Sequence, residues 1–141
     1  MYLLDTNTVS DLMRHPGGHV AARLATIDAA SVVISPVVAC EIAFGLARLE
    51  VPRLKTAWSL ILAALPIVPM GDELVQPYAS VRRALEAAGT PIGPNDLLIA
   101  AHALALDAVV VTDNVREFSR VPGLQVENWL VPVDPPGEGP T

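Results

Sequence analysis

Short apolar runs alternate along the chain with longer segments in which apolar residues recur at helical spacing. The runs that predict strands are residues 2–4, 31–34, 66–69, 109–111 and, more weakly, 124–127. They show little alternation of apolar and polar positions, and several are rich in β-branched residues. Strands of this kind are buried on both faces, as in a parallel sheet covered by helices. The pattern therefore predicts an α/β fold in three layers, α/β/α, with a parallel sheet of four to five strands.

The segments between these runs carry the start and stop signals of helices. We expect helices at residues 9–14, 19–29, 36–49, 52–65, 72–88 and 97–106. Ser35 and Pro36 supply an N-cap and a first-turn proline for the third of them, and Gly89 ends the fifth. Residues 1–131 can bury one core, so we predict a single domain. Residues 132–141 are rich in proline and glycine, and we predict a flexible tail there.

The chain is strongly apolar, yet it contains no segment suited to a membrane. Hydrophobic residues make up 52% of its 141 positions and aromatic residues only 4%, so the core must be aliphatic. Its longest apolar runs, 57–70 and 97–111, are interrupted by proline or polar residues and fall short of the roughly 20 residues that cross a bilayer. The N-terminus lacks the basic region of a signal peptide. Since Cys40 is the only cysteine, we expect no internal disulfide and a cytoplasmic protein.

Four acidic residues lie where predicted strands end or where helices begin. Asp5 and Asp113 each follow a strand, and Glu41 and Asp96 lie near the starts of helices. Taken singly, Asp5, Asp96 and Asp113 are better explained by capping, by the helix dipole and by a turn than by catalysis. Glu41 is harder to explain, because its neighbours are apolar and an unpaired buried carboxylate is costly. Ligands bind at the carboxyl ends of parallel strands, so we expect the four acids to converge there.

Neighbouring residues could relieve two of these acids of a capping role. Thr6 or Thr8 could cap the first helix as well as Asp5. In the same way, Asn95 could cap the helix that Asp96 begins. Both carboxylates would then be free for chemistry.

Four converging carboxylates would need a cation, because each raises the pKa of the others. Ligands that are all oxygen select a hard ion, namely Mg²⁺, which Mn²⁺ can replace. Zinc is not expected, since the three histidines show no ligand spacing and Cys40 is alone. A divalent ion in such a site activates water and neutralises charge in phosphoryl transfer. The acids therefore predict a metal centre that hydrolyses phosphodiesters.

Five stretches of the chain occur in a recognisable order: residues 3–7, 35–45, 89–103, 111–118 and 121–129. Together they resemble a PIN domain, and the third is very similar to VapC-type toxins. The resemblance covers nearly the whole chain up to Trp129 and implies the three-layer PIN-like fold for residues 1–131. It also implies an Mg²⁺-dependent endoribonuclease, the toxin of a type II toxin–antitoxin pair. Such toxins are usually homodimers and are inhibited by a small cognate antitoxin.

The resemblance assigns the acids their roles. Asp5 and Asp96 match the family's central metal ligands, and Glu41 matches its third acid. We take Asp113 as the fourth catalytic and metal-binding residue, although the position stays open between it and two neighbours. The secondary candidates lie beside these acids in the sequence and are Thr6, Asn7, Thr112, Asn114 and Glu117.

The RNA substrate that the resemblance implies would need basic side chains. The candidates are Arg14, Arg82, Arg83, Arg116 and Arg120, of which Arg116 lies closest in sequence to an acid of the centre. The net charge of −6 is unfavourable for a nucleic-acid enzyme, so we expect local basic patches or a basic partner. With so few aromatic residues, we expect base stacking to be minor and structured RNA to be read by shape.

Two other functions compete with this interpretation. A phosphotransferase or phosphatase that uses Asp5 as nucleophile would want a second aspartate at position 7, which is Asn7, and a lysine, but the only lysine is Lys55 in a predicted helix. A catalytically silent PIN-like module that only binds a partner is the non-enzymatic alternative. Retention of all four acids argues against it.

Overall fold

The fold, described here from a computed structural model, is built on a four-stranded parallel sheet. The structure describes residues 1–132, so most of the predicted tail lies outside the described residues. The strands are β1 (Tyr2–Leu4), β2 (Val32–Val33), β3 (Val109–Val111) and β4 (Val126–Glu127), and their order in the sheet is β2-β1-β3-β4. All three pairings are parallel. The predicted α/β fold with a parallel sheet is confirmed.

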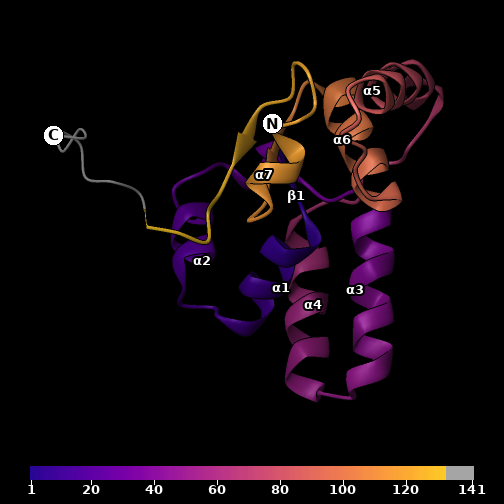
Figure 1. Cartoon of the computed structure of the whole chain (residues 1–141). Helices are drawn as coiled ribbons and strands as arrows, with labels where there is room; N and C mark the ends of the chain where they lie inside the picture. The colour runs from indigo at the N-terminus through magenta and orange to yellow at the C-terminus, as the bar shows by residue number, and fades with distance from the viewer. Residues whose placement is uncertain (133–141) are drawn as a thin grey trace, which may run out of the picture.

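Seven α-helices and two short 3-10 turns connect and cover the strands within residues 1–132. The α-helices are α1 (Thr6–Arg14), α2 (His19–Leu24), α3 (Pro36–Leu49), α4 (Pro52–Ala64), α5 (Val75–Ala87), α6 (Pro94–Leu106) and α7 (Val115–Phe118). The 3-10 turns are η1 (Ala29–Ser31) and η2 (Asp72–Leu74). Helices α3 and α4 form a long hairpin that projects from one end of the molecule, whereas α5 and α6 lie at the other end (Figure 1). No helix in this part of the chain is long and apolar enough to cross a membrane.

The core is aliphatic, as the composition predicts. Leu3 and Leu4 of β1 and Val110 and Val111 of β3 are fully buried, and Phe118 of α7 is the largest of the fully buried side chains. Burying each such side chain stabilises the fold by roughly 1.5–3 kcal/mol. The sheet is therefore fixed by apolar contacts on both faces, which leaves its carboxyl edge free to carry polar groups.

The register of the central strands sets the position of that edge. Leu4 is paired with Val111, and the next residue, Asp5, donates its backbone N–H to Val111 O at 2.9 Å. On the other side, the Thr112 N–H donates to Glu127 O at 2.9 Å. Asp5 and Thr112 thus leave the sheet at the same level.

The predicted strand at residues 66–69 is wrong. Only an isolated parallel bridge between Ile34 and Ile67 forms there. Its hydrogen bonds run from Ile34 N to Pro66 O and from Val68 N to Ile34 O, both at 3.0 Å. Pro66 and Pro69 have no N–H to donate, so the ladder cannot extend.

Several helix boundaries also differ from those predicted. The first helix starts at Thr6 rather than at residue 9, and α6 starts at Pro94 rather than at residue 97. The helix predicted for 19–29 ends at Leu24, and the one predicted for 72–88 divides into η2 and α5. Proline at the first position favours the early start of α6, so Asp96 lies inside its first turn.

Candidate active site

Asp5 is held at the carboxyl end of β1 by three hydrogen bonds. It caps α1, accepting from Thr6 N at 2.8 Å, so the expectation that a threonine would replace it as cap is wrong. Its other oxygen, Oδ2, accepts from Thr112 Oγ1 at 2.8 Å and from Asn7 Nδ2 at 3.2 Å. Burial raises its pKa, as does the charge of Asp113, whereas these hydrogen bonds lower it. A carboxylate that is only 4% exposed is thereby fixed in orientation.

The secondary candidates Asn7, Thr112 and Asn114 tie the ends of β1 and β3 together. Asn7 donates to Asp5 and accepts from the backbone N–H of Asp113 at 3.2 Å. Thr112 accepts from the backbone N–H of Asn114 at 3.0 Å while it donates to Asp5. These residues therefore position Asp5 and the loop after β3.

Glu41 reaches the same edge from α3. Its Oε1 accepts a hydrogen bond of 3.0 Å from Thr6 Oγ1, and its charge contributes to the raised pKa of Asp96. Helix α3 starts at the edge because Ser35 caps it, accepting from Val37 N at 3.1 Å. Thr6 is thus a hydroxyl bridge between the cap of α1 and the acid of α3.

Asp96 and Glu117 face each other at the start of α6, and their pKa values shift in opposite directions. Burial, a hydrogen bond to Glu117 and the charges of Asp5, Glu117 and Glu41 together raise the pKa of Asp96 to about 7. Burial also acts to raise the pKa of Glu117, but hydrogen bonds from Gly93 N and Asn114 and contact with Asp96 lower it overall. Of the two carboxyl groups, Asp96 therefore keeps its proton to the higher pH.

Glu117 is fixed more firmly than the sequence suggests. Its Oε1 accepts from Gly93 N at 2.8 Å, and its Oε2 accepts from the amide of Asn114. Asp113, by contrast, is exposed, and its side chain has no hydrogen bond with another described residue. Geometry thus places Glu117 against Asp96 and leaves Asp113 at the rim, where its charge acts on Asp5. The role of Asp113 as fourth ligand stays a prediction.

The donor chemistry of this centre fits a hard divalent cation. Its side chains offer oxygen only, and burial together with the charges of its acidic neighbours raises the pKa of Asp96. Across residues 1–132, no three His, Cys, Asp or Glu side chains already stand in an arrangement that could hold a metal ion. A cation would have to replace the proton of Asp96 and draw the carboxylates closer.

The predicted RNA-binding arginines occupy different surroundings. Arg14 lines a groove of about 220 Å³ that also contains Glu41. Arg120 donates to Pro91 O at 3.3 Å, next to the loop that precedes α6. Arg116 and Arg83 are exposed. Proximity to the acids thus favours Arg14 and Arg120 over the arginines of α5, whereas RNA binding by Arg116 stays a prediction.

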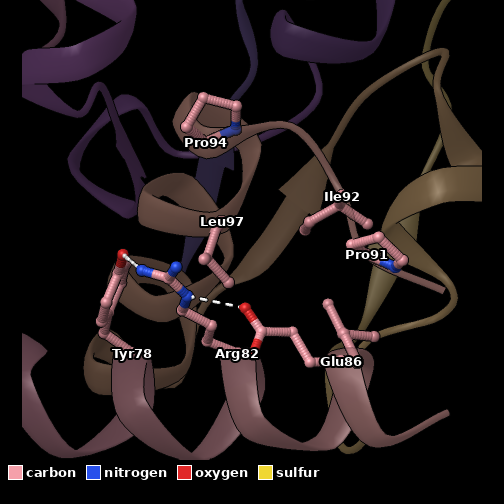
Figure 2. A pocket seen from close by; sticks show the side chains of 8 residues that line it. Tyr78, Arg82, Glu86, Pro91, Ile92, Pro94 and Leu97 are labelled. Atoms are coloured by element: carbon pink, nitrogen blue, oxygen red, sulfur yellow. Dashed lines mark hydrogen bonds and ion pairs between the residues drawn. The ribbon is translucent and has the colours of Figure 1, made fainter. Parts of the chain in front are cut away.

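Arg82 is engaged elsewhere. Figure 2 shows it between Tyr78 and Glu86 in a hollow of about 170 Å³ beside α5, with Pro91 and Ile92 opposite. It donates to Glu86 Oε1 at 3.0 Å and to the Tyr78 hydroxyl at 3.1 Å. None of the acids of the centre lines this hollow. Its charge is already paired, which weakens the prediction that Arg82 binds RNA.

Two contributors to the centre were missed by the sequence reasoning. The Gly93 N–H holds Glu117, and a Cβ at Gly93 would lie 3.8 Å from Glu117 Oε1 and 3.9 Å from Asp96 Oδ2. A glycine directly before a helix-starting proline was the available signal. Arg48, on the same helix as Glu41, lines the groove with Arg14 and gave no signal beyond its charge.

Comparison with known proteins defines the class. The profile of the PIN domain family matches residues 2–124, most of the chain. The chain belongs to the PIN domain family.

Its relatives are more specific. Ribonuclease VapC2 of Rickettsia felis is 34% identical over 131 residues, which are 92% of this chain and 98% of the relative. The tRNA(fMet)-specific endonuclease VapC of Salmonella typhimurium is 30% identical over 129 residues, 91% of this chain and 97% of the relative. A solved structure of VapBC2 from Rickettsia felis, bound to a promoter DNA fragment, contains a chain that superposes with a TM-score of 0.84 at 32% identity, covering 91% of this chain and 98% of that chain. Within the PIN domain family, the chain lies among the VapC proteins.

Proposed function

We propose that this protein is a divalent-metal-dependent endoribonuclease, the toxin of a VapBC-type toxin–antitoxin pair. The observation that carries the proposal is the gathering of acids at one edge of the sheet, where Asp5 is bound by Thr112, Glu41 by Thr6 and Glu117 by Gly93 N. Burial, Glu117 and the charges of Asp5 and Glu41 raise the pKa of Asp96 there to about 7. A site that stores like charges without a cation suits a metal better than it suits a purely structural role. The names of the relatives as ribonucleases support RNA as the substrate.

Asp5, Glu41 and Asp96 would hold Mg²⁺ or Mn²⁺, with the fourth position filled by Asp113 or Glu117, directly or through water. When bound, such an ion supplies a water of lowered pKa and neutralises charge on the phosphodiester. Thr112 and Asn7 keep Asp5 in one orientation through their hydrogen bonds. Thr6 does the same for Glu41.

Hydrolysis also needs a group that accepts or returns a proton. The pKa of Glu117 is lowered by its hydrogen bonds from Gly93 N and Asn114, whereas that of Asp96 is raised, so Glu117 is the first of the two to ionise. Once Asp96 has lost its proton, Glu117 remains hydrogen-bonded to Gly93 N and Asn114, within the same cluster. It is the residue best placed to accept a proton there. The Asp113 side chain is exposed and could serve only from the rim.

A protein partner belongs to the proposal. The solved chains that resemble this one come from VapBC complexes. We infer that a small cognate antitoxin inhibits the nuclease, and that a basic side chain of the partner neutralises the acids in the inhibited complex. This basic partner would also compensate the net charge of −6. A homodimer remains part of the proposal on the basis of the family resemblance.

A fluorogenic RNA cleavage assay tests the proposed activity. We expect the wild type to cleave with Mg²⁺ and to stop when EDTA is added, and Asp5→Asn to be inactive under both conditions. Asp72→Asn, which removes an exposed acid of η2 outside the centre, is the matched control and should cleave like the wild type. Cleavage in EDTA, or by Asp5→Asn at the wild-type rate, would contradict the mechanism. A folded wild type that cleaves no RNA would favour the catalytically silent module.

A further inference from the structure

Phe44 is a solvent-exposed aromatic side chain on α3, the helix that carries Glu41. It is 64% exposed, although α3 packs its Val38, Ile42 and Leu46 side into the core. Single exposed apolar side chains are common, and Leu60 is 67% exposed, so exposure alone does not indicate a ligand. Phe44 differs in being the only exposed aromatic side chain in residues 1–132, and its surroundings therefore matter.

Arg48 covers part of this ring. Its guanidinium carbon lies 4.9 Å from the centroid of Phe44, one turn further along α3. Both ion pairs in residues 1–132 involve other arginines, so Arg48 has no carboxylate partner in the described part of the chain. An aromatic ring next to an unpaired guanidinium is a surface suited to a flat group linked to an anion.

The ring opens onto the candidate active site. Phe44 lines an open hollow of about 410 Å³ together with Glu41, Cys40 and Asn95. Glu41 and Phe44 are three residues apart and so lie on one face of the helix. Asn95 directly precedes Asp96 on α6. A group stacked on Phe44 would therefore sit within one helical turn of an acid of the centre.

A second depression meets the first at Glu41. The groove lined by Arg14 also contains Glu41, Thr6 and Arg48. Glu41 thus borders two hollows, one with two arginines and one with an exposed aromatic ring, and Arg48 belongs to the first while it covers the ring in the second. Phosphates and a base of one strand would match these two hollows.

We propose that Phe44 and Arg48 form a subsite for one unpaired RNA nucleotide, with the base stacked on the Phe44 ring and a neighbouring phosphate against Arg48. The subsite rests on the proposed nuclease function and specifies its substrate as RNA that is single-stranded at this position. It reverses the expectation, drawn from the low aromatic content, that base stacking is minor. A second copy of the chain is the competing occupant, but it would bring its own Arg14 and Arg48 to a face that already carries both.

Cleavage kinetics on an unstructured RNA oligonucleotide test the subsite. We expect Phe44→Leu to raise KM by roughly tenfold, since it keeps an apolar side chain but loses the stacking face. Phe44→Trp should keep the wild-type KM, and kcat should stay within about twofold in both variants. Leu60→Ala, which removes an exposed apolar side chain of α4 remote from both hollows, is the control and should behave like the wild type.

The role of Arg48 is tested by the salt dependence of RNA binding. Arg48→Gln should weaken RNA binding and reduce the slope of log affinity against log salt concentration by about one phosphate contact. A wild-type KM in Phe44→Leu, or equal impairment of Phe44→Leu and Phe44→Trp, would overturn the subsite. So would sedimentation showing that Phe44→Leu dissociates a dimer, because the face would then belong to a second copy.

Cys40 offers a readout that does not depend on cleavage. It is the only cysteine, it is exposed, and it lines the same hollow as Phe44. In the Asp96→Asn background, the oligonucleotide should slow alkylation of Cys40, and adding Phe44→Leu should abolish that protection. If RNA protects Cys40 but the wild type cleaves nothing, the nuclease proposal fails and the subsite stands. If the wild type cleaves and Cys40 reacts equally with and without RNA, the subsite fails alone.

Discussion

The acidic centre and the hollow beside α5 differ in whether their charged side chains have partners of opposite charge. In the hollow, Arg82 is paired with Glu86 at 3.0 Å and both side chains remain in contact with water. In the centre, Asp96 lies among acids, and burial and like charge raise its pKa to about 7. The hollow is a well-formed depression with its charges satisfied, whereas the centre stores an electrostatic cost that the fold alone does not relieve. A carboxyl group whose pKa is shifted by burial and like charge is therefore a better sign of a catalytic site than a surface hollow.

The largest effect should come from removing the perturbed acid. Asp96→Asn should lower single-turnover cleavage on the order of 1,000-fold, because the variant would lose a proposed metal ligand, and a bound metal contributes several kcal/mol of charge stabilisation. Without metal, the variant should unfold at the same or a higher temperature than the wild type, since a repelled carboxyl has been removed. Cleavage assays and thermal unfolding in EDTA measure the two quantities. A variant that loses both activity and metal-free stability would show Asp96 to be structural.

The two candidates for the fourth position should differ in effect. Glu117→Gln should lower cleavage roughly 10- to 100-fold, because Glu117 contacts Asp96 and is held by Gly93 N and Asn114. Asp113→Asn should cost only a few-fold, about the effect of one exposed charge. Parallel measurement of kcat/KM for both variants decides the assignment. A larger loss in Asp113→Asn would restore Asp113 as the direct ligand.

Metal affinity should depend on pH through Asp96. Its folded-state pKa is raised from 3.8 to about 7, so its contribution to metal-free stability is full below pH 3.8 and is lost as the pH rises through about 7. A cation must displace that proton, so Mn²⁺ affinity should fall about tenfold for each pH unit below 7. Calorimetric titration at pH 6, 7 and 8 measures it. An affinity that does not change over this range would contradict the raised pKa of Asp96.

Changes in the α5 hollow should have the smallest effect. Arg82→Ala and Glu86→Gln should each leave RNA cleavage within about twofold of the wild type, because their ion pair is exposed and lies in a hollow that none of the acids of the centre lines. The same RNA assay measures both. A large rise in KM in Arg82→Ala alone would return Arg82 to the RNA-binding surface and weaken the contrast between the two regions.

The same apolar pattern in the sequence predicts both the parallel sheet and the gathering of acids at its edge. Uninterrupted apolar strands require a covered parallel sheet, and the residues that follow β1 and β3 must then share an edge, which brings Asp5 and Thr112 together. Pro66 and Pro69 argue against a strand at 66–69, but the apolar residues between them led to the wrong prediction. Local signals of this kind are readable because they act within one element.

The rest of the centre depends on contacts between distant segments, which no local pattern encodes. Glu117 is placed by Gly93, 24 residues away in the chain, and only the packing of α7 against the loop before α6 brings them together. The exposure of Phe44 could not be predicted either, because the residues around it on α3 are apolar and give no sign of which of them face solvent. Which face of α3 turns inward is decided by α1 and the core, and so required the structure.

Crystallography with Mn²⁺, read by anomalous scattering, tests the metal centre most directly. A strong peak is expected between the carboxylates of Asp5 and Asp96, with Glu41 at the same edge. A crystal grown in excess Mn²⁺ that shows no peak at this edge, with Asp5 and Asp96 directed to separate surfaces, would contradict it.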